Sequence, residues 1–209
     1  TVMLISRDAA EMATYGIDAS ISSFIANKTR ELKDLSTDEE LAGIVSDLTE
    51  KKNEKAEAVK MAIRGIMARA KNAFGEQSAK FRRFGTKGMD EMRDVELYRC
   101  GKRVIRVAQT YLAELTVKGL TQAIIDDLKN TNTIFDDKID LKDDAERQRD
   151  IATANRISMA NQLYSKIVEV CDYGKEHWKA KNEAKYNDYV IYEMPPQETQ
   201  GTPTPPPVA

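Results

Sequence analysis

The chain has 209 residues, of which 41% are hydrophobic and 32% are charged, and its formal net charge is −2. A chain of this length can bury a sizeable core without disulfides, and two cysteines, Cys100 and Cys171, are too few for a disulfide framework. Because His177 is the only histidine, metal sites that need several histidines are excluded. No stretch approaches the ~18 apolar residues of a membrane span, so we expect no membrane insertion.

The prolines divide the chain into two parts. All six lie between Pro195 and Pro207. We therefore predict a single helical-bundle domain over residues 1–194 and a flexible, Pro-rich tail over residues 195–209, because the tail has little apolar surface to bury. No signal peptide is recognisable, so we expect a cytoplasmic protein, with a virion or surface assembly as the open alternative.

Hydrophobic periodicity predicts a first helix that begins near Ser6 and ends near Leu35. Asp8 would lie in its first turn, where a carboxylate complements the helix dipole. The apolar residues between Ile17 and Leu35 recur at helical spacing and predict one core-facing side.

The residues from Ser36 to Glu39 have the pattern of a capping box and predict that a second helix starts there after a short turn. The apolar pattern continues to Phe74, and Gly75 supplies a C-terminal cap. The middle, residues 50–57, is polar on nearly all sides. We interpret it as a solvated stretch or a frayed break.

A glycine-containing irregular connection is expected over residues 75–90, followed by a third helix over residues 91–118. A fourth helical segment starts at Thr121 and extends to about residue 179. Residues 130–133 have poor helix propensity and could break it. The predicted fold is an all-α, elongated, mostly antiparallel bundle of four principal helices, or five if the last is broken there.

The two most β-prone tetrads of the domain, residues 2–5 and 189–192, lie near its two ends. They could pair as a two-stranded ribbon. We favour the alternative that each lies extended over the end of the bundle.

Charge is segregated along the chain. Residues 51–118 contain 17 basic and 8 acidic side chains, whereas the fourth helix is rich in Asp. The candidate basic patch comprises Arg82, Arg83, Lys87, Arg99, Lys102, Arg103 and Arg106. It could contact phosphate or nucleic acid, or it could line the contact of the basic third helix with the acidic fourth. We favour the second interpretation, because the sequence pI is about 5.7 and no recognised nucleic-acid motif is present.

The remaining candidates for chemistry each have a structural interpretation. The acidic run at residues 136–144 lacks the glycine and the bidentate Glu of a calcium loop and reads as a solvated face. We expect His177 to interact with a helix C-terminus, and Cys100 and Cys171 to be buried thiols. Gly85 and Gly88 would let the chain reverse direction.

We predict neither a catalytic residue nor a bound cofactor or metal. A late cluster of tyrosines, Tyr186, Tyr189 and Tyr192, suits either a partner surface or a cap on the bundle end. The sequence thus favours a non-enzymatic structural or protein-interaction module with a protein partner or a second copy of itself. The alternative is anion or nucleic-acid binding through residues 80–106.

Four stretches together carry a resemblance: Ile5 to Asp8, Phe81 to Gly88, Gly119 to Leu128, and Ala184 to Tyr189. In these stretches the chain resembles a group of all-helical proteins of similar length from Bacteroidota, to which no activity is assigned. The resemblance covers most of residues 5–192 and implies a helical bundle and a bacterial source. It transfers no functional residue.

Overall fold

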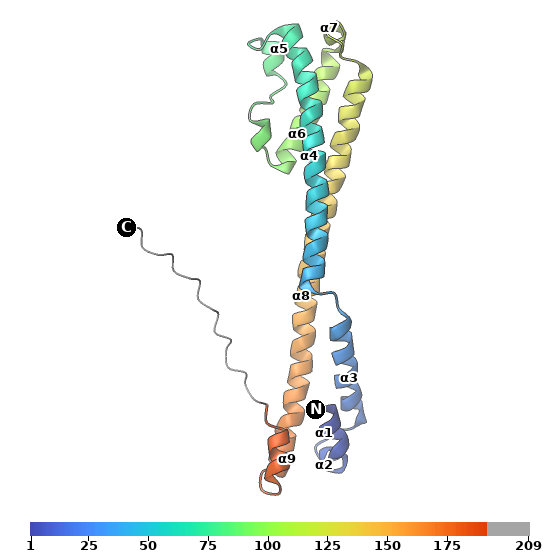
Figure 1. Cartoon of the computed structure of the whole chain (residues 1–209), viewed down its shortest axis with the longest axis vertical. Helices are drawn as coiled ribbons and strands as arrows, with labels where there is room; N and C mark the ends of the chain where they lie inside the picture. Colours follow the sequence, from blue (N-terminus) through green and yellow to red (C-terminus); the bar gives the residue numbers. More distant parts are fainter. Residues whose placement is uncertain (192–209) are drawn as a thin grey trace, which may run out of the picture. The chain divides into compact units, whose positions relative to one another are not determined.

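The computed structural model describes residues 1–191, and in this part the chain forms helices and no strands (Figure 1). The predicted tail and Tyr192 lie outside the described residues. The all-α fold expected from the sequence is therefore confirmed. The helices are α1 (Val2–Arg7), α2 (Ala9–Ala13), α3 (Ala19–Asp34), α4 (Asp38–Phe74), α5 (Ala79–Arg82), the 3₁₀ turn η1 (Met89–Glu91), α6 (Asp94–Thr110), α7 (Leu112–Thr116), α8 (Gln122–Trp178) and α9 (Glu183–Asp188).

The described residues divide into two compact units. Unit 1 combines Thr1–Leu35 with the residues from Asn155 onward, and unit 2 comprises Ser36–Ala154. Each unit has its own hydrophobic cluster. The domain predicted as a single bundle over residues 1–194 thus has two cores, and α8 contributes residues to both.

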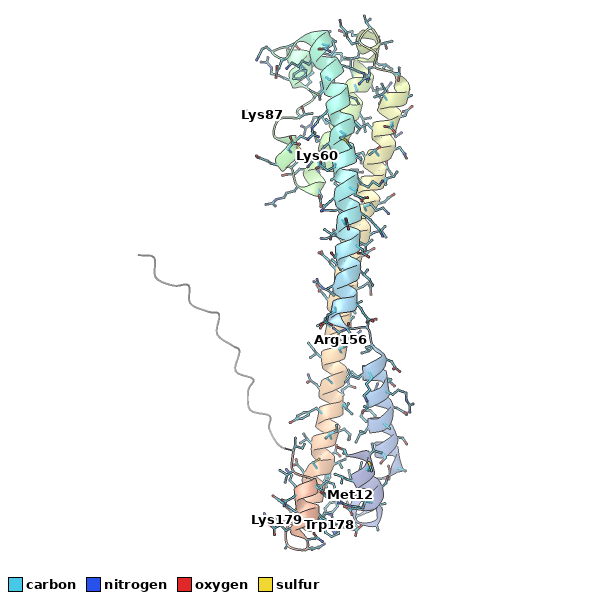
Figure 2. The ribbon with its side chains drawn as sticks, viewed as in Figure 1. Met12, Lys60, Lys87, Arg156, Trp178 and Lys179 are labelled. Atoms are coloured by element: carbon cyan, nitrogen blue, oxygen red, sulfur yellow. The ribbon has the colours of Figure 1, made fainter. Side chains whose placement is uncertain are left out.

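Unit 1 packs α1, α2, α3 and α9 around the later part of α8. Its buried residues include Ile5, Met12, Val170 and Trp178, and Figure 2 labels Met12 and Trp178 in this unit. The first predicted helix is divided into three. Gly16, at a φ of 77°, allows a turn after α2, and the Asp18 carboxylate then caps α3 by accepting a hydrogen bond from Ser20 N at 2.8 Å.

Neither β-prone tetrad forms a strand within the described residues. Val2 to Ile5 lie in α1, and α9 ends just before Tyr189. Ile5 and Tyr189 are both buried in the cluster of unit 1. No ribbon forms within the described residues, and Val2 to Ile5 are helical instead of extended, because a short helix lets Ile5 pack in the cluster of unit 1.

Unit 2 is built on α4, α6 and the first part of α8. Val59, Ile63, Ile66 and Ala70 of α4 are buried with Leu97 and Val104 of α6 and with Ile125, Leu128 and Phe135 of α8. Figure 1 shows α4 beside α8 in this unit, with α6 flanking the second half of α4. The apolar stripes predicted from the sequence thus face one common core.

The boundaries of α4 correct one detail of the sequence analysis. Its capping box uses Thr37 and Glu40, one residue later than predicted, and Gly75 follows the last residue as expected. The polar middle over residues 50–57 does not break the helix. The third predicted helix is interrupted at Tyr111, so that α6 and α7 take its place.

The fourth predicted helix remains one helix through residues 130–133. The site of the expected break is held by Asn132, which is 2% exposed and lies against Gly101 of α6. Its side-chain amide donates a hydrogen bond to Tyr98 O at 3.3 Å. Tertiary packing therefore outweighs the low intrinsic propensity of this segment.

Among the described helices, none is both long and apolar enough to cross a bilayer.

Candidate functional site

The candidate site is the connection between α4 and α6, here called the central connection and defined as residues 76–93. Two glycines shape it: Gly85 and Gly88 have φ angles of 63° and 71°, which favour glycine. Phe84 is fully buried and Met89 is 7% exposed, so both side chains anchor the connection in the core of unit 2. The backbone at both glycines thus has the left-handed conformation that a turn requires, in keeping with the expected chain reversal.

Two cations of the basic patch, together with the nearby Lys80, hold the connection in place. Arg103 of α6 donates a hydrogen bond to Gly85 O at 3.1 Å, and Arg83 donates one to the Tyr111 hydroxyl at 2.7 Å. Lys80 pairs with Glu114 and lies 5.3 Å from the centroids of the Phe74 and Tyr111 rings.

Lys102 has an aromatic partner as well, since its ammonium lies 4.5 Å from the centroid of the Tyr98 ring. These partners belong to α4, the central connection, α6 and α7. The contact with the acidic residues of α8 that the sequence favours is not found for these four cations within the described residues. Three of the seven patch residues therefore contact groups of their own segment.

All seven cations of the patch are exposed, and the other four form no ion pair within the described residues. Arg82 and Lys87 belong to the central connection, and Arg99 and Arg106 lie on α6. Figure 2 labels Lys87 on the connection. Two surface hollows, each of roughly 500 Å³, share Lys87: one is bounded by Phe81, Arg82 and Thr86, the other by Arg99, Arg103 and Glu96. Sequence reasoning found these cations but not the hollows, since hollows depend on how the connection folds onto α6.

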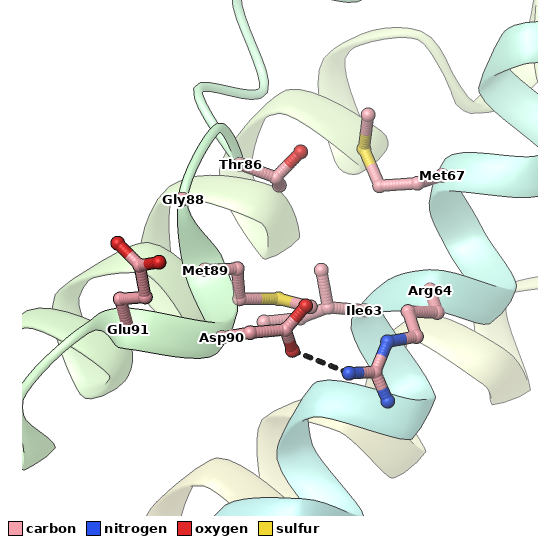
Figure 3. Close-up of a pocket in the computed structure, with 8 residues that line it drawn as sticks. All are labelled: Ile63, Arg64, Met67, Thr86, Gly88, Met89, Asp90 and Glu91. Atoms are coloured by element: carbon pink, nitrogen blue, oxygen red, sulfur yellow. Dashed lines mark hydrogen bonds and ion pairs between the residues drawn. The ribbon is translucent and has the colours of Figure 1, made fainter.

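A third hollow lies on the side of the connection that faces α4. Figure 3 shows Met89 directed toward Ile63 of α4 and the guanidinium of Arg64 joined to Asp90 by an ion pair. The hollow has a volume of about 360 Å³. The ion pair of Arg64 with Asp90 closes one edge of this hollow, and Met89 lines it. The residues around the hollow therefore attach the connection to α4.

A buried carboxylate in unit 1 is the strongest electrostatic feature that the sequence analysis missed. Asp8 is 0% exposed and accepts hydrogen bonds from Arg7 Nη2 at 2.7 Å, Lys185 Nζ at 2.8 Å and the Tyr189 hydroxyl at 2.9 Å. The hydrogen bond from Arg7, assisted by those from Lys185 and Tyr189, holds the pKa of Asp8 far below its usual range. Asp8 thus joins α1 to α9 instead of complementing a helix dipole.

The tyrosines of the late cluster have different environments. Tyr189 is 0% exposed, its ring lies against Gly174 of α8, and burial raises the pKa of its hydroxyl. It is a core residue and not part of an exposed surface. Tyr186 is half-buried against the same cluster. The alternative of a cap on the bundle end therefore describes these two residues.

The remaining candidates lie where a structural role suits them. Cys100 and Cys171 are buried free thiols whose pKa burial raises, as expected from their helical patterns. His177 lies in the last turn of α8, and its ring is steeply inclined to the rings of Tyr15 and Trp178. The acidic run is a helical stretch of α8, and the described residues contain no group of three or more His, Cys, Asp or Glu arranged to hold a metal ion.

No family model matches the chain, and neither do any curated proteins or solved structures.

Proposed function

We propose that this chain is a non-catalytic helical module that presents the surface of its long helices to a protein partner, a second copy of the chain included. The support comes from apolar side chains that unit 2 leaves uncovered. In α4 the buried residues begin only at Ala56, and in α8 they stop after Phe135 and resume at Leu163. Long stretches of both helices therefore lack a core of their own.

The two-helix segment, defined as residues 38–52 of α4 and 139–153 of α8, contains the relevant surface. Thr153 Oγ1 donates a hydrogen bond to Asp38 Oδ1 at 3.0 Å, which joins α8 to the first turn of α4. Leu41, Val45 and Leu48 are only half-buried there. A pair of helices buries one stripe on each, and a third or fourth helix is needed to cover the neighbouring positions.

The segment also carries large apolar side chains that are about half exposed to solvent. Ile44 is 53% exposed, Ile151 is 53% exposed and Leu141 is 47% exposed. Single exposed apolar residues are common, but three of them beside a half-buried apolar stripe are typical of an association surface. This concentration of apolar side chains is the observation that carries the proposal.

The buried ionisable groups support a non-catalytic role. Asp8 uses its oxygens to bind Arg7, Lys185 and Tyr189, and burial keeps the two thiols protonated, which makes them poor nucleophiles. Each of these groups thus has a role in the fold that accounts for its burial.

Analytical ultracentrifugation of the full chain tests the self-association form of the proposal. We expect an oligomer that Ile44→Lys combined with Ile151→Lys dissociates, because both charges would enter the apolar contact. Val117→Lys is the matched control: Val117 is 82% exposed in unit 2 but lies outside the two-helix segment, so this variant should assemble like the wild type.

A photo-crosslinking amino acid placed at position 44, 151 or 117 in the native host tests a different protein as partner. We expect a discrete crosslinked protein at positions 44 and 151 and none at 117. A monomeric wild type that also gives no crosslink at 44 or 151 beyond that at 117 would refute the proposed surface.

A further inference from the structure

The cations around the central connection are not balanced by the carboxylates near them. Residues 79–110 contain nine basic and four acidic side chains. Of the acidic ones, Asp90 pairs with Arg64 and Asp94 pairs with Lys52, both cations of α4. Glu96 accepts a hydrogen bond from Arg93 N at 3.0 Å. Three of the four carboxylates therefore have partners other than the exposed cations of the patch.

The exposed cations converge where the connection meets α6. Lys87 lies between Gly85 and Gly88, the two glycines with positive φ angles. Arg99 and Arg103 lie four residues apart on one face of α6. All three cations line the same hollow, which has a volume of about 500 Å³. Among the described residues, neither Lys87 nor Arg99 forms an ion pair with a carboxylate. Their charges are thus available to a ligand.

We propose that this hollow, here called the Lys87 hollow, binds the phosphate group of a phosphorylated ligand. A guanidinium matches the oxygens of phosphate in a planar, two-bond geometry, and a lysine adds a compact third charge. The hollow supplies both kinds of donor within one concave surface. This inference concerns a different part of unit 2 from the two-helix segment and does not depend on the proposed protein interaction.

The roles of the three cations differ. Arg103 Nη1 donates to Gly85 O, and a Cβ on Gly85 would run into the Arg103 guanidinium, so this arginine also holds the connection on α6. Lys87 and Arg99 do not hold the connection on α6 in this way. They are the donors that bind the ligand. Arg103 is a positioning residue that sets the distance between the connection and α6.

Two glutamates also border the hollow. Glu96 caps the first turn of α6 through Arg93 N, which directs its oxygen toward the backbone. Glu91 is exposed on η1 and also borders the hollow on the α4 side. Three cations against these two carboxylates leave the hollow a formal net charge of about +1, which favours an anionic ligand.

The adjoining hollow indicates which chemical group the ligand carries next to its phosphate. It shares Lys87 and is bounded by the half-buried ring of Phe81 and by Arg82. A phosphate held at the Lys87 hollow would leave the rest of the ligand beside an aromatic ring and a second guanidinium, an arrangement that suits a nucleoside base. The shared chemistry is therefore a nucleotide phosphate, either in a free nucleotide or in a single strand.

Fluorescence anisotropy with a fluorescein-labelled oligothymidylate, at low salt and with the full chain, measures this binding. We expect affinity that falls with salt, and a loss of about tenfold or more in Lys87→Gln combined with Arg99→Gln, because two phosphate contacts are removed. Arg103 is left unchanged, since its loss would also release the connection. Both substituted residues are exposed, so the helix content measured by circular dichroism should match that of the wild type.

The control variant Lys118→Gln combined with Lys129→Gln removes the same charge from exposed positions of unit 2 outside the hollow. It should bind nearly as the wild type does. Competition by ATP at constant ionic strength separates the two sources: displacement at equal phosphate concentration indicates a free nucleotide, and failure to displace indicates a strand. The proposal is overturned if the wild type binds neither probe, or if the two double variants lose affinity equally.

Discussion

Replacing the buried carboxylate of Asp8 by an amide, in Asp8→Asn, tests the role assigned to it in unit 1. The amide has the same shape, but its NH₂ group faces Arg7 and Lys185, which offer only donors. Breaking a buried ion pair by removing one partner costs ~3–5 kcal/mol. Here the side chains of Arg7 and Lys185 are 39% and 31% exposed and can turn toward water. We therefore expect the free energy of unfolding to fall by about 2–3 kcal/mol.

Trp178 provides a local reporter for this experiment. It is the only tryptophan, it is 9% exposed in unit 1, and Lys185 Nζ lies 3.8 Å from the centroid of its ring. Urea unfolding followed by tryptophan fluorescence therefore reports on the unit that contains Asp8. The matched control is Asp18→Asn in the same unit: Asp18 is an exposed N-cap, and Asn caps equally well, so we expect a change below about 0.5 kcal/mol.

The difference in unfolding free energy between the wild type and Asp8→Asn depends on pH with a defined sign. The pKa of Asp8 is lowered in the folded state, so its contribution to stability is complete above the unfolded pKa of about 3.9 and is lost as the pH falls toward the folded value. The gap between wild type and Asp8→Asn should stay constant between about pH 5 and pH 8 and shrink below about pH 4. A gap under about 0.5 kcal/mol at neutral pH, equal to that of the Asp18 control, would falsify the reasoning.

Two further predictions concern buried positions of the two units. Gly101→Ala places a Cβ against the side chain of Asn132 and should lower the free energy of unfolding by about 1–3 kcal/mol, measured by urea titration followed by circular dichroism. Gly43→Ala in α4 meets nothing within 4 Å and should raise it by about 0.5–1 kcal/mol; equal effects of the two would contradict the close approach of α6 and α8. Because burial raises the pKa of both thiols, Ellman's reagent should modify Cys100 and Cys171 only when urea opens the unit that contains each; rapid reaction of either in the native protein would be inconsistent with its burial.

The long helices could be predicted because their signals are local. The stripe that includes Ile63 and Ile66 recurs every three or four residues, and Gly75 ends α4 where a helix C-cap was expected. Low propensity at residues 130–133 was a weaker signal than the contact of Asn132 with Gly101, which only the folded chain creates. Local patterns therefore predicted which residues would form helices better than where those helices would end.

The polar contacts were the part that local patterns did not reveal. Asp8 and Tyr189 are separated by 181 residues, and nothing in either neighbourhood specifies the other. The cations of the basic patch were identified from composition alone. The path of the backbone at Gly85 and Gly88 decides the role of each cation. It places Arg103 where it holds the connection and leaves Lys87 for a ligand.

Because unit 1 is assembled from both ends of the described chain, its formation has an unusual order. During synthesis, residues 1–35 leave the ribosome before unit 2 but cannot meet α9 until every residue of unit 2 has followed. Unit 2 is continuous in sequence and can complete its core earlier, which shortens the effective loop that must close between Asp8 and Tyr189. Helices α1, α2 and α3 are therefore buried only after unit 2 has been made, and until then Met12 and Ile25 stay exposed to chaperones and proteases.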